Sequence, residues 1–179
     1  MDISKKILGD ATRPAAYSKK MPPTATYFLH GLDSSGKGTK GRFFAEKFPD
    51  VVCPDFTGTL PERLDQLEKL CTSQRQLIFI GSSFGGLMAT CYAVGRPEKV
   101  ARLILLAPAL NFAGYRPPAA LLRLPTLLIM GNQDTVTPPA IVTPLAEATF
   151  ADLQIRLVDD DHLLHATFHR LDWRKLLTR

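Results

Sequence analysis

Residues 77–86 of the 179-residue chain read LIFIGSSFGG, four apolar residues followed by a glycine-rich turn that contains two serines. The uninterrupted apolar run predicts a strand buried on both faces, as in a parallel sheet that helices cover. A helical pattern begins at Phe84 and extends to Gly95. The stretch matches G-x-S-x-G, in which the central serine lies on a sharp turn between strand and helix. We therefore predict Ser83 as a nucleophile; a glycine-rich loop with a capping serine is the alternative.

The same alternation of short apolar runs and longer helical patterns extends along the chain from Thr24. Strands are predicted over residues 25–30, 50–53, 76–81, 101–107, 126–131 and 154–158. Helices are predicted over residues 38–48, 60–73, 84–95, 138–148 and 163–177. This order predicts an α/β fold of three layers, in which about six mostly parallel strands are flanked by helices.

The length and composition predict one domain over residues 24–179, preceded by a loosely attached basic leader over residues 1–23. With 45% hydrophobic and 22% charged residues, the composition is that of a globular domain rather than a disordered or fibrous chain. The connection over residues 110–124 is too short to hold a separate cap domain. We therefore expect a core without a cap.

The net charge of +5 is concentrated at the two ends of the chain. Residues 1–23 and 163–179 each carry a net charge of +3, so the residues between them sum to −1. Basic side chains do not alternate with aromatic ones, and we predict no nucleic-acid partner. The longest apolar run, residues 103–110, is too short for a membrane span, and no secretory signal is evident. The sequence thus predicts a soluble, cytoplasmic protein.

Three cysteines, Cys53, Cys71 and Cys91, lie in apolar or amphipathic stretches and form no C-x-x-C pair. Their odd number and their surroundings predict buried free thiols rather than a disulfide framework or a metal site. We accordingly predict no metal and no cofactor.

A nucleophilic serine needs a histidine that takes its proton and an acid that orients that histidine. In an open α/β sheet, the residues that follow the strands lie at the ligand-binding edge. Asp134 follows the predicted strand at 126–131, and His162 follows the one at 154–158. The order Ser83, Asp134, His162 at three strand ends indicates a catalytic triad. Asp134 by itself would also suit a cap for the helix expected to begin after it.

The position of the four histidines allows the base to be chosen. His162 lies in the loop after the last predicted strand. His165 and His169 lie further along, in the C-terminal helical pattern, and His30 ends the first strand. His162 is therefore the predicted base and His165 the second candidate. The acids at residues 159–161 are predicted to be solvated, with one of them available to orient the loop.

The first predicted strand ends in HGLD at residues 30–33, the position that supplies an oxyanion-hole donor in hydrolases with G-x-S-x-G. The elements HGL, GSSFG, GNQD and DH, in this order, resemble the α/β-hydrolase superfamily, above all its small lidless esterase and thioesterase branches. The resemblance spans residues 24–165. For the site it implies a triad and two backbone donors of an oxyanion hole, namely Ser83, Asp134 and His162, with Leu32 and Phe84.

The resemblance implies a serine hydrolase that cleaves a carboxylic ester or thioester of a small or medium acyl group through an acyl-enzyme. Without a cap, the acyl pocket is expected to be shallow and open. His30, Asp33 and Lys37 are predicted as a substrate rim. Lys37, Lys40 and Arg42 either attract an anionic substrate or are merely solvated. The predicted partner is a small molecule, and the oligomeric state is left open.

Residues 31–39, GLDSSGKGT, allow a different interpretation, because they follow a strand, precede a helix and resemble the phosphate loop of nucleoside monophosphate kinases. Gly38 replaces the hydroxyl residue that normally follows the lysine, although Thr39 comes next. A kinase also needs a magnesium-binding acid, for which Asp55 is available, and an arginine-rich lid, which the sequence lacks. A nucleotide-binding kinase is therefore the alternative function, together with a non-catalytic binding protein of hydrolase fold.

Overall fold

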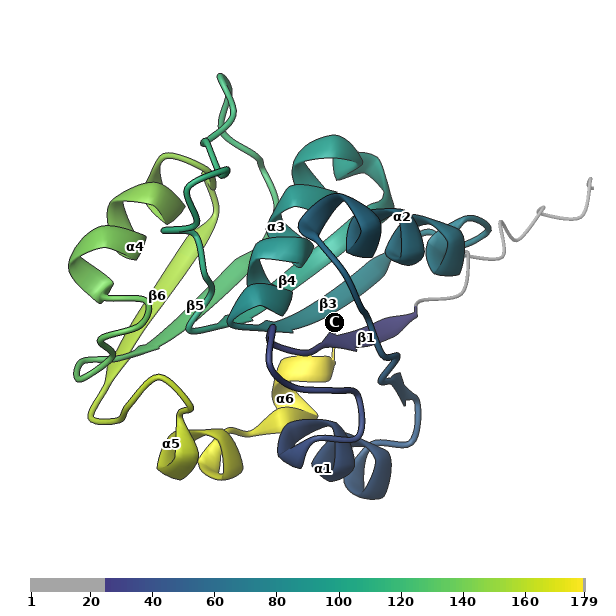
Figure 1. Cartoon of the computed structure of the whole chain (residues 1–179), viewed down its shortest axis with the longest axis horizontal. Helices are drawn as coiled ribbons and strands as arrows, with labels where there is room; N and C mark the ends of the chain where they lie inside the picture. The colour runs from purple at the N-terminus through teal and green to yellow at the C-terminus, as the bar shows by residue number, and fades with distance from the viewer. Residues whose placement is uncertain (1–24, 179) are drawn as a thin grey trace, which may run out of the picture.

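The computed structural model of the protein describes residues 25–178, and the predicted leader over residues 1–23 lies outside them. Six strands form one parallel sheet in the order β2-β1-β3-β4-β5-β6 (Figure 1). The strands are β1 (Thr26–Leu29), β2 (Val51–Val52), β3 (Leu77–Ser82), β4 (Val100–Leu106), β5 (Thr126–Gly131) and β6 (Leu153–Val158). The predicted α/β fold with about six parallel strands is confirmed.

Helices cover both faces of this sheet. They are α1 (Thr39–Lys47), α2 (Leu60–Cys71), α3 (Phe84–Gly95), α4 (Pro139–Glu147), α5 (His165–Arg170) and α6 (Trp173–Leu177), with a 3-10 turn η1 (Pro97–Lys99). One face carries α2, α3 and α4, and the other carries α1, α5 and α6 (Figure 1). None of the helices within residues 25–178 is long and apolar enough to cross a membrane. The result is the expected three-layer architecture.

The buried core divides into two clusters, one on each side of the sheet. Strand residues supply both clusters, because successive side chains of a strand point to opposite faces. In β4, Leu103 and Leu105 belong to the cluster with α2, α3 and α4, whereas Ile104 and Leu106 belong to the cluster with α1, α5 and α6. This double burial explains why the central strands read as continuous apolar runs. The edge strand β6 instead alternates between half-buried and exposed residues along most of its length.

The single helix predicted over residues 163–177 is in fact two short helices, so that prediction was wrong. The backbone of Leu171 is extended and ends α5. The carboxylate of Asp172 then caps α6 by accepting a hydrogen bond from the backbone N–H of Lys175 at 3.1 Å. Apolar side chains of both helices enter the same core cluster. Their spacing therefore continues across the break and conceals it in the sequence.

The connection between β4 and β5 contains no helix in the part of the chain that the structure describes. It is tied down by a parallel bridge between Leu122 and Phe150 and by a hydrogen bond from the side chain of Asn111 to the carbonyl oxygen of Val136 at 2.9 Å. This segment adds no cap over the carboxyl ends of the strands.

The three cysteines carry no disulfide bond. Cys71 is buried, and Cys53 and Cys91 are half-buried. Burial raises the pKa of Cys53 and Cys91 to about 11 and that of Cys71 to about 12. The thiols therefore remain protonated near neutral pH, as in unreactive structural cysteines.

Candidate active site

The turn between β3 and α3 holds Ser83 in a rare backbone conformation, with φ of 54° and ψ of −117°. Two glycines allow the turn to be this sharp. A Cβ atom on Gly85 would overlap the carbonyl oxygen of Leu29, and one on Gly81 would lie 2.6 Å from the carbonyl oxygen of Gly85. The backbone N–H of Ser83 donates to the carbonyl oxygen of Leu106 at 2.9 Å. The chain thus fixes the serine at the carboxyl end of the sheet.

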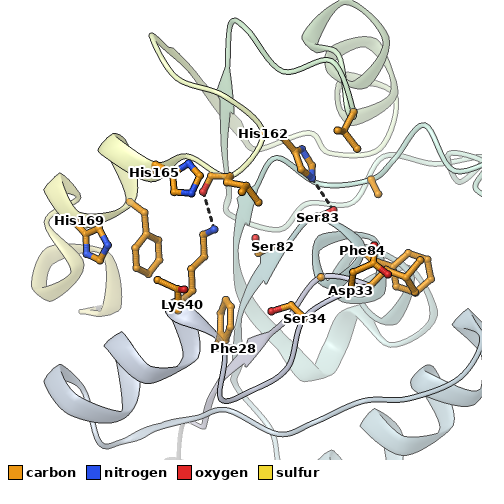
Figure 2. A pocket seen from close by; sticks show the side chains of 17 residues that line it. Phe28, Asp33, Ser34, Lys40, Ser82, Ser83, Phe84, His162, His165 and His169 are labelled. Carbon is orange, nitrogen blue, oxygen red and sulfur yellow. Dashed lines mark hydrogen bonds between the residues drawn. The ribbon is translucent and has the colours of Figure 1, made fainter.

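The structure brings Ser83, His162 and Asp134 together in one hydrogen-bonded series. The hydroxyl of Ser83 lies 3.0 Å from Nε2 of His162 (Figure 2), and Nδ1 of His162 lies 2.8 Å from Oδ2 of Asp134. A carboxylate only accepts hydrogen bonds, so Nδ1 carries the proton and Nε2 is left to accept from the serine. The Asp134 side chain is fully buried and that of His162 is 16% exposed. The arrangement can therefore remove the proton of the serine hydroxyl.

Thr137 orients the carboxylate of Asp134 and was missed in the sequence. Its hydroxyl donates to Oδ2 of Asp134 at 2.6 Å, and its backbone N–H donates to Oδ1 at 2.8 Å. The N–H of Val136 also donates to Oδ1. Burial by itself would raise the pKa of Asp134, but the bonds from Thr137 and the neighbouring His162 outweigh it and lower the pKa. Asp134 does not cap α4, whose N-cap is Pro138 without a side-chain cap bond; its carboxylate instead closes the turn before that helix. The D-x-x-T spacing was the available signal for Thr137.

The loop that carries His162 is held from two sides. Asp160 is buried and accepts hydrogen bonds from two backbone N–H groups, including that of Thr167 in α5 at 2.7 Å. It therefore orients the loop and is not solvated. From the opposite side, the ammonium group of Lys40 in α1 donates to the carbonyl oxygen of Leu163 at 2.7 Å. The contacts of Asp160 are local, whereas that of Lys40 joins parts of the chain that are far apart in sequence.

The other histidines near the loop do not contact the serine. His165, the second candidate for the base, lines the cavity, but its side chain is 69% exposed and its Nδ1 lies 3.1 Å from Oδ2 of Asp161. The ring of His169 packs against the rings of Phe43 and Phe168. Among these histidines, His162 is the one that accepts the hydrogen bond from the hydroxyl of Ser83.

The loop after β1 lies beside Ser83, since a Cβ atom on Gly31 would lie 3.5 Å from the Cβ of Ser83. Leu32 follows in this loop. Phe84 is the first residue of α3, where a backbone N–H has no acceptor in a preceding turn of the same helix. Both Leu32 and Phe84 line the cavity at the serine. The two residues predicted for the oxyanion hole therefore border the same space.

Arg63 of α2 contacts both of these residues, and the sequence contained no signal for it. Its side chain is buried, with the residue only 4% exposed. Nη2 donates to the carbonyl oxygen of Leu32 at 3.3 Å and Nε to that of Gly58 at 3.0 Å. The guanidinium carbon lies 5.3 Å from the centroid of the Phe84 ring. Arg63 thus connects the loop after β1 to the start of α3.

The three predicted rim residues have different positions. Asp33 lines the cavity, whereas Lys37 is exposed and lies outside the lining. His30 is buried: its Nε2 accepts from the backbone N–H of Phe56 at 2.9 Å, and its Nδ1 lies 2.7 Å from the carbonyl oxygen of Gly31. Burial also lowers the pKa of His30. The prediction of His30 as a rim residue was wrong, because its ring ties the loop after β1 to the segment before α2.

In the loop over residues 31–39, backbone N–H groups that could bind a phosphate are occupied. Three consecutive backbone N–H groups already have acceptors inside the protein. That of Gly36 donates to the carboxylate of Asp55 at 2.5 Å, and the next two donate to the hydroxyl and the carbonyl oxygen of Ser35 at 3.2 and 3.0 Å. A Cβ atom on Gly36 would overlap the carbonyl oxygen of Cys53, so the glycine serves close packing. The backbone donors that would hold a phosphate are therefore engaged elsewhere.

A cavity of about 510 Å³ opens at Ser83 (Figure 2). Its lining combines aromatic side chains, among them Phe28, Phe84 and Phe168, with hydroxyl and imidazole groups. Asp134 is buried behind His162 and does not line it. The volume lies within the range of about 300 to 1,000 Å³ that is typical of small-molecule sites.

The fold and this site together define the class of the protein. A parallel sheet carries, at the carboxyl ends of three strands, a serine on a strained turn, a histidine and a buried aspartate. The model of the family described as the alpha/beta hydrolase fold matches residues 27–124, more than half of the chain. The chain belongs to the alpha/beta hydrolase fold family.

Comparison with known proteins adds individual relatives. Lipase LipV of Mycobacterium tuberculosis is 26% identical over 169 residues, which cover 85% of this chain and 62% of that protein. The chain thus spans less than two thirds of the length of this curated relative. Alpha/beta hydrolase domain-containing protein 10 from mouse has a TM-score of 0.71 and 20% identity, covering 87% of this chain and 91% of that one. A thermophilic esterase from Thermogutta terrifontis with bound malate has a TM-score of 0.66 and 18% identity, covering 88% and 92%. At these identities, the two structures show the shared fold.

Proposed function

We propose that the chain is a serine hydrolase that cleaves a carboxylic ester or a thioester of a small or medium acyl group. The observation that carries the proposal is the hydrogen-bonded series of Ser83, His162 and Asp134. In this arrangement the histidine activates the serine hydroxyl and the aspartate holds the histidine. Membership of the hydrolase fold family and similarity to a protein named as a lipase support the same class of reaction.

In the proposed reaction, Oγ of Ser83 attacks the carbonyl carbon of the substrate while its proton passes to Nε2 of His162. Asp134 stabilises the imidazolium that forms. The backbone N–H groups of Leu32 and Phe84 bind the oxyanion of the tetrahedral intermediate. His162 then gives the proton to the departing alcohol or thiol, which leaves the acyl group on Ser83. A water molecule deprotonated by His162 attacks this acyl group, releases the acid and restores the serine.

The surroundings of the serine support a small substrate that stays close to the surface. The cavity volume suits a small molecule. Leu32, Val136 and Leu163 line the cavity and are 50%, 59% and 50% exposed. Such side chains suit an acyl chain that is only partly enclosed. The proposed steps use protein groups and water alone, and we expect the reaction to take place in the cytoplasm.

Covalent labelling tests the proposed nucleophile. The wild-type protein should react with a fluorophosphonate probe and hydrolyse short para-nitrophenyl esters, and Ser83→Ala should do neither. Ser82→Ala is the matched control, because Ser82 precedes the nucleophile and also lines the cavity. It should retain both labelling and hydrolysis. Labelling that persists in Ser83→Ala would contradict the assignment.

A further inference from the structure

The cavity at Ser83 extends to a second region, here called the Lys40 arm, which is formed by Lys40, Leu163, His165, Phe168 and His169. Figure 2 shows Lys40, His165 and His169 on the opposite side of the cavity from Phe84 and Asp33, with Phe28 between the two regions. None of the steps proposed above uses the side chains of the arm. Their chemistry therefore bears on which substrate the site accepts.

Lys40 lies in the first turn of α1, and its ammonium group points toward the other residues of the arm. It donates one hydrogen bond, to the carbonyl oxygen of Leu163 at 2.7 Å, and lies 5.5 Å from the centroid of the Phe168 ring. An ammonium group has three N–H donors, so two remain for a ligand. No carboxylate among residues 25–178 lies within 4.0 Å of the nitrogen. Lys40 is thus a half-buried cation that lacks a direct anionic partner within the described chain.

The acids around Lys40 are bound to other groups. Asp161 accepts hydrogen bonds from Nδ1 of His165 and from a backbone N–H of its own loop. Asp160 accepts from backbone N–H groups of the same loop and of α5. Burial lowers the pKa of Lys40, and the charges of Asp161 and Asp160 partly oppose this effect. Asp33, the one acid in the described lining of the cavity, lies across it from Lys40 (Figure 2).

We propose that the Lys40 arm binds an anionic group of the substrate, so that the ester or thioester cleaved at Ser83 also carries a carboxylate or a group of similar charge. The ammonium group of Lys40 donates a hydrogen bond to this anion, and the imidazoles of His165 and His169 lie next to the bound anion. The rings of Phe28 and Phe168 contact the apolar part that links the anion to the scissile bond. The inference rests on the proposed hydrolase function and names its substrate class.

Two matched pairs of esters test this proposal and locate the anion. In the first pair, para-nitrophenyl glutarate and para-nitrophenyl pentanoate differ by a carboxylate on the acyl side. In the second pair, para-acetoxybenzoate and its methyl ester differ by a carboxylate on the leaving group. The quantity measured is kcat/KM for the acidic ester divided by kcat/KM for its neutral partner. This ratio cancels any effect that a variant has on the position of the His162 loop.

Three variants are compared with the wild type. Lys40→Met keeps an unbranched side chain of similar length and removes the charge, whereas Lys40→Arg keeps a charge. Lys47→Met removes an exposed lysine from the last turn of the same helix and serves as the control. A hydrogen bond to a charged group contributes about 1.5 to 3 kcal/mol. In one of the two pairs, Lys40→Met should therefore lower the ratio by a factor of about ten or more. Lys40→Arg should restore part of it, and Lys47→Met should leave it unchanged.

Equal losses on the acidic and the neutral ester in both pairs would overturn the proposal, because Lys40 would then act only as a support for the loop at Leu163. Binding of para-acetoxybenzoate and of its methyl ester to Ser83→Ala, measured by calorimetry, separates this outcome from failure of the hydrolase function. The acidic ester should bind more tightly, and Lys40→Met in the same background should remove the difference. The anion site would also be rejected if para-acetoxybenzoate and its methyl ester bound Ser83→Ala with equal affinity and if Lys40→Met did not change the binding of para-nitrophenyl glutarate. This conclusion would hold whether or not the wild type hydrolyses any ester.

Discussion

Two glycine-rich loops in this protein follow strands of the same sheet and precede helices, yet they use their backbones differently. In the elbow loop, residues 81–86, glycines bring α3 against β1 and β3 and leave Ser83 at the cavity. In the GK loop, residues 31–39, Gly36 packs against the segment after β2, and backbone N–H groups are bound to Asp55 and to Ser35. A glycine-rich turn thus becomes a reactive site only where close packing leaves a functional group facing open space.

The two loops are also coupled. Leu32 of the GK loop and Phe84 of the elbow loop are the proposed oxyanion donors, and Arg63 contacts both. The GK loop therefore takes part in the proposed chemistry through its first residues rather than through Lys37. Four substitutions, each in one of the loops or beside it, test this difference.

The largest effect is expected from His162→Ala, which removes the base that serves the elbow loop. Loss of a triad member lowers the rate of serine hydrolases by about 10⁴-fold or more. We expect kcat/KM on a para-nitrophenyl ester to fall by that order. His165→Ala is the control, because this exposed residue lies three positions along the same loop and helix. A comparable loss in His165→Ala, with His162→Ala active, would reverse the assignment of the base.

Arg63→Met should lower kcat by about 10- to 100-fold with little change in KM, because displacement of an oxyanion donor weakens the transition state more than the bound substrate. Lys69→Met, an exposed position on the same helix, should have no effect. The midpoint of thermal unfolding, measured in parallel, reports the structural contribution of Arg63. Lower thermal stability with unchanged kcat would show that Arg63 has no role in positioning the donors.

Thr137→Val should lower kcat/KM by about tenfold, the worth of one hydrogen bond to a charged group. Loss of the hydroxyl should also raise the pKa of Asp134, which in the folded protein lies below its ordinary value of 3.8. A carboxyl group with a lowered pKa stabilises the fold at pH values above its ordinary pKa. This contribution is lost as the pH falls through the lowered pKa. The variant should therefore be less stable than the wild type at neutral pH, with a smaller difference in acid.

Urea unfolding of both proteins at neutral and acidic pH measures this difference. Thr135→Val, an exposed position in the same turn, is the control and should follow the wild type at both pH values. A stability difference for Thr137→Val that does not depend on pH would exclude a role through Asp134.

Lys37→Ala should have the smallest effect. Because Lys37 is exposed and lies outside the cavity lining, we expect kcat/KM to change by less than about twofold, as for an ordinary surface substitution. Calorimetry with ATP and magnesium should detect no binding to either protein. Micromolar binding to the wild type that Lys37→Ala abolishes would instead identify the GK loop as a nucleotide site.

Much of the fold was predictable because burial on both faces produces continuous apolar strands separated by helical patterns. Ser83, Asp134 and His162 could be selected because parallel strands bring their carboxyl ends to one edge of the sheet. The break between α5 and α6 was not predictable, since the apolar spacing continues across it. The close packing of Gly36 depends on the segment after β2, which the motif itself does not include.

The supporting residues of the site were largely hidden in the sequence. Lys40 was considered in the sequence as a cation that attracts the substrate, but its contact with the His162 loop was not. Arg63 and Lys40 both donate to backbone carbonyl groups of distant loops, and a carbonyl group is present at every residue and gives no sequence signal. His30 was assigned to the rim because it ends a strand, but the direction of its ring depends on the backbone N–H of Phe56. Thr137 was the one supporting residue with a readable spacing, three positions after Asp134.

The acyl-enzyme proposed at Ser83 can be trapped directly. The protein is mixed with a para-nitrophenyl ester, quenched in acid within the first turnovers and digested, and the peptides are analysed by mass spectrometry. We predict one acyl group, located on Ser83, in the wild type and in Ser82→Ala, and none at that position in Ser83→Ala. Hydrolysis that proceeds with no acylated residue, or with the acyl group on a different side chain, would contradict the proposed mechanism.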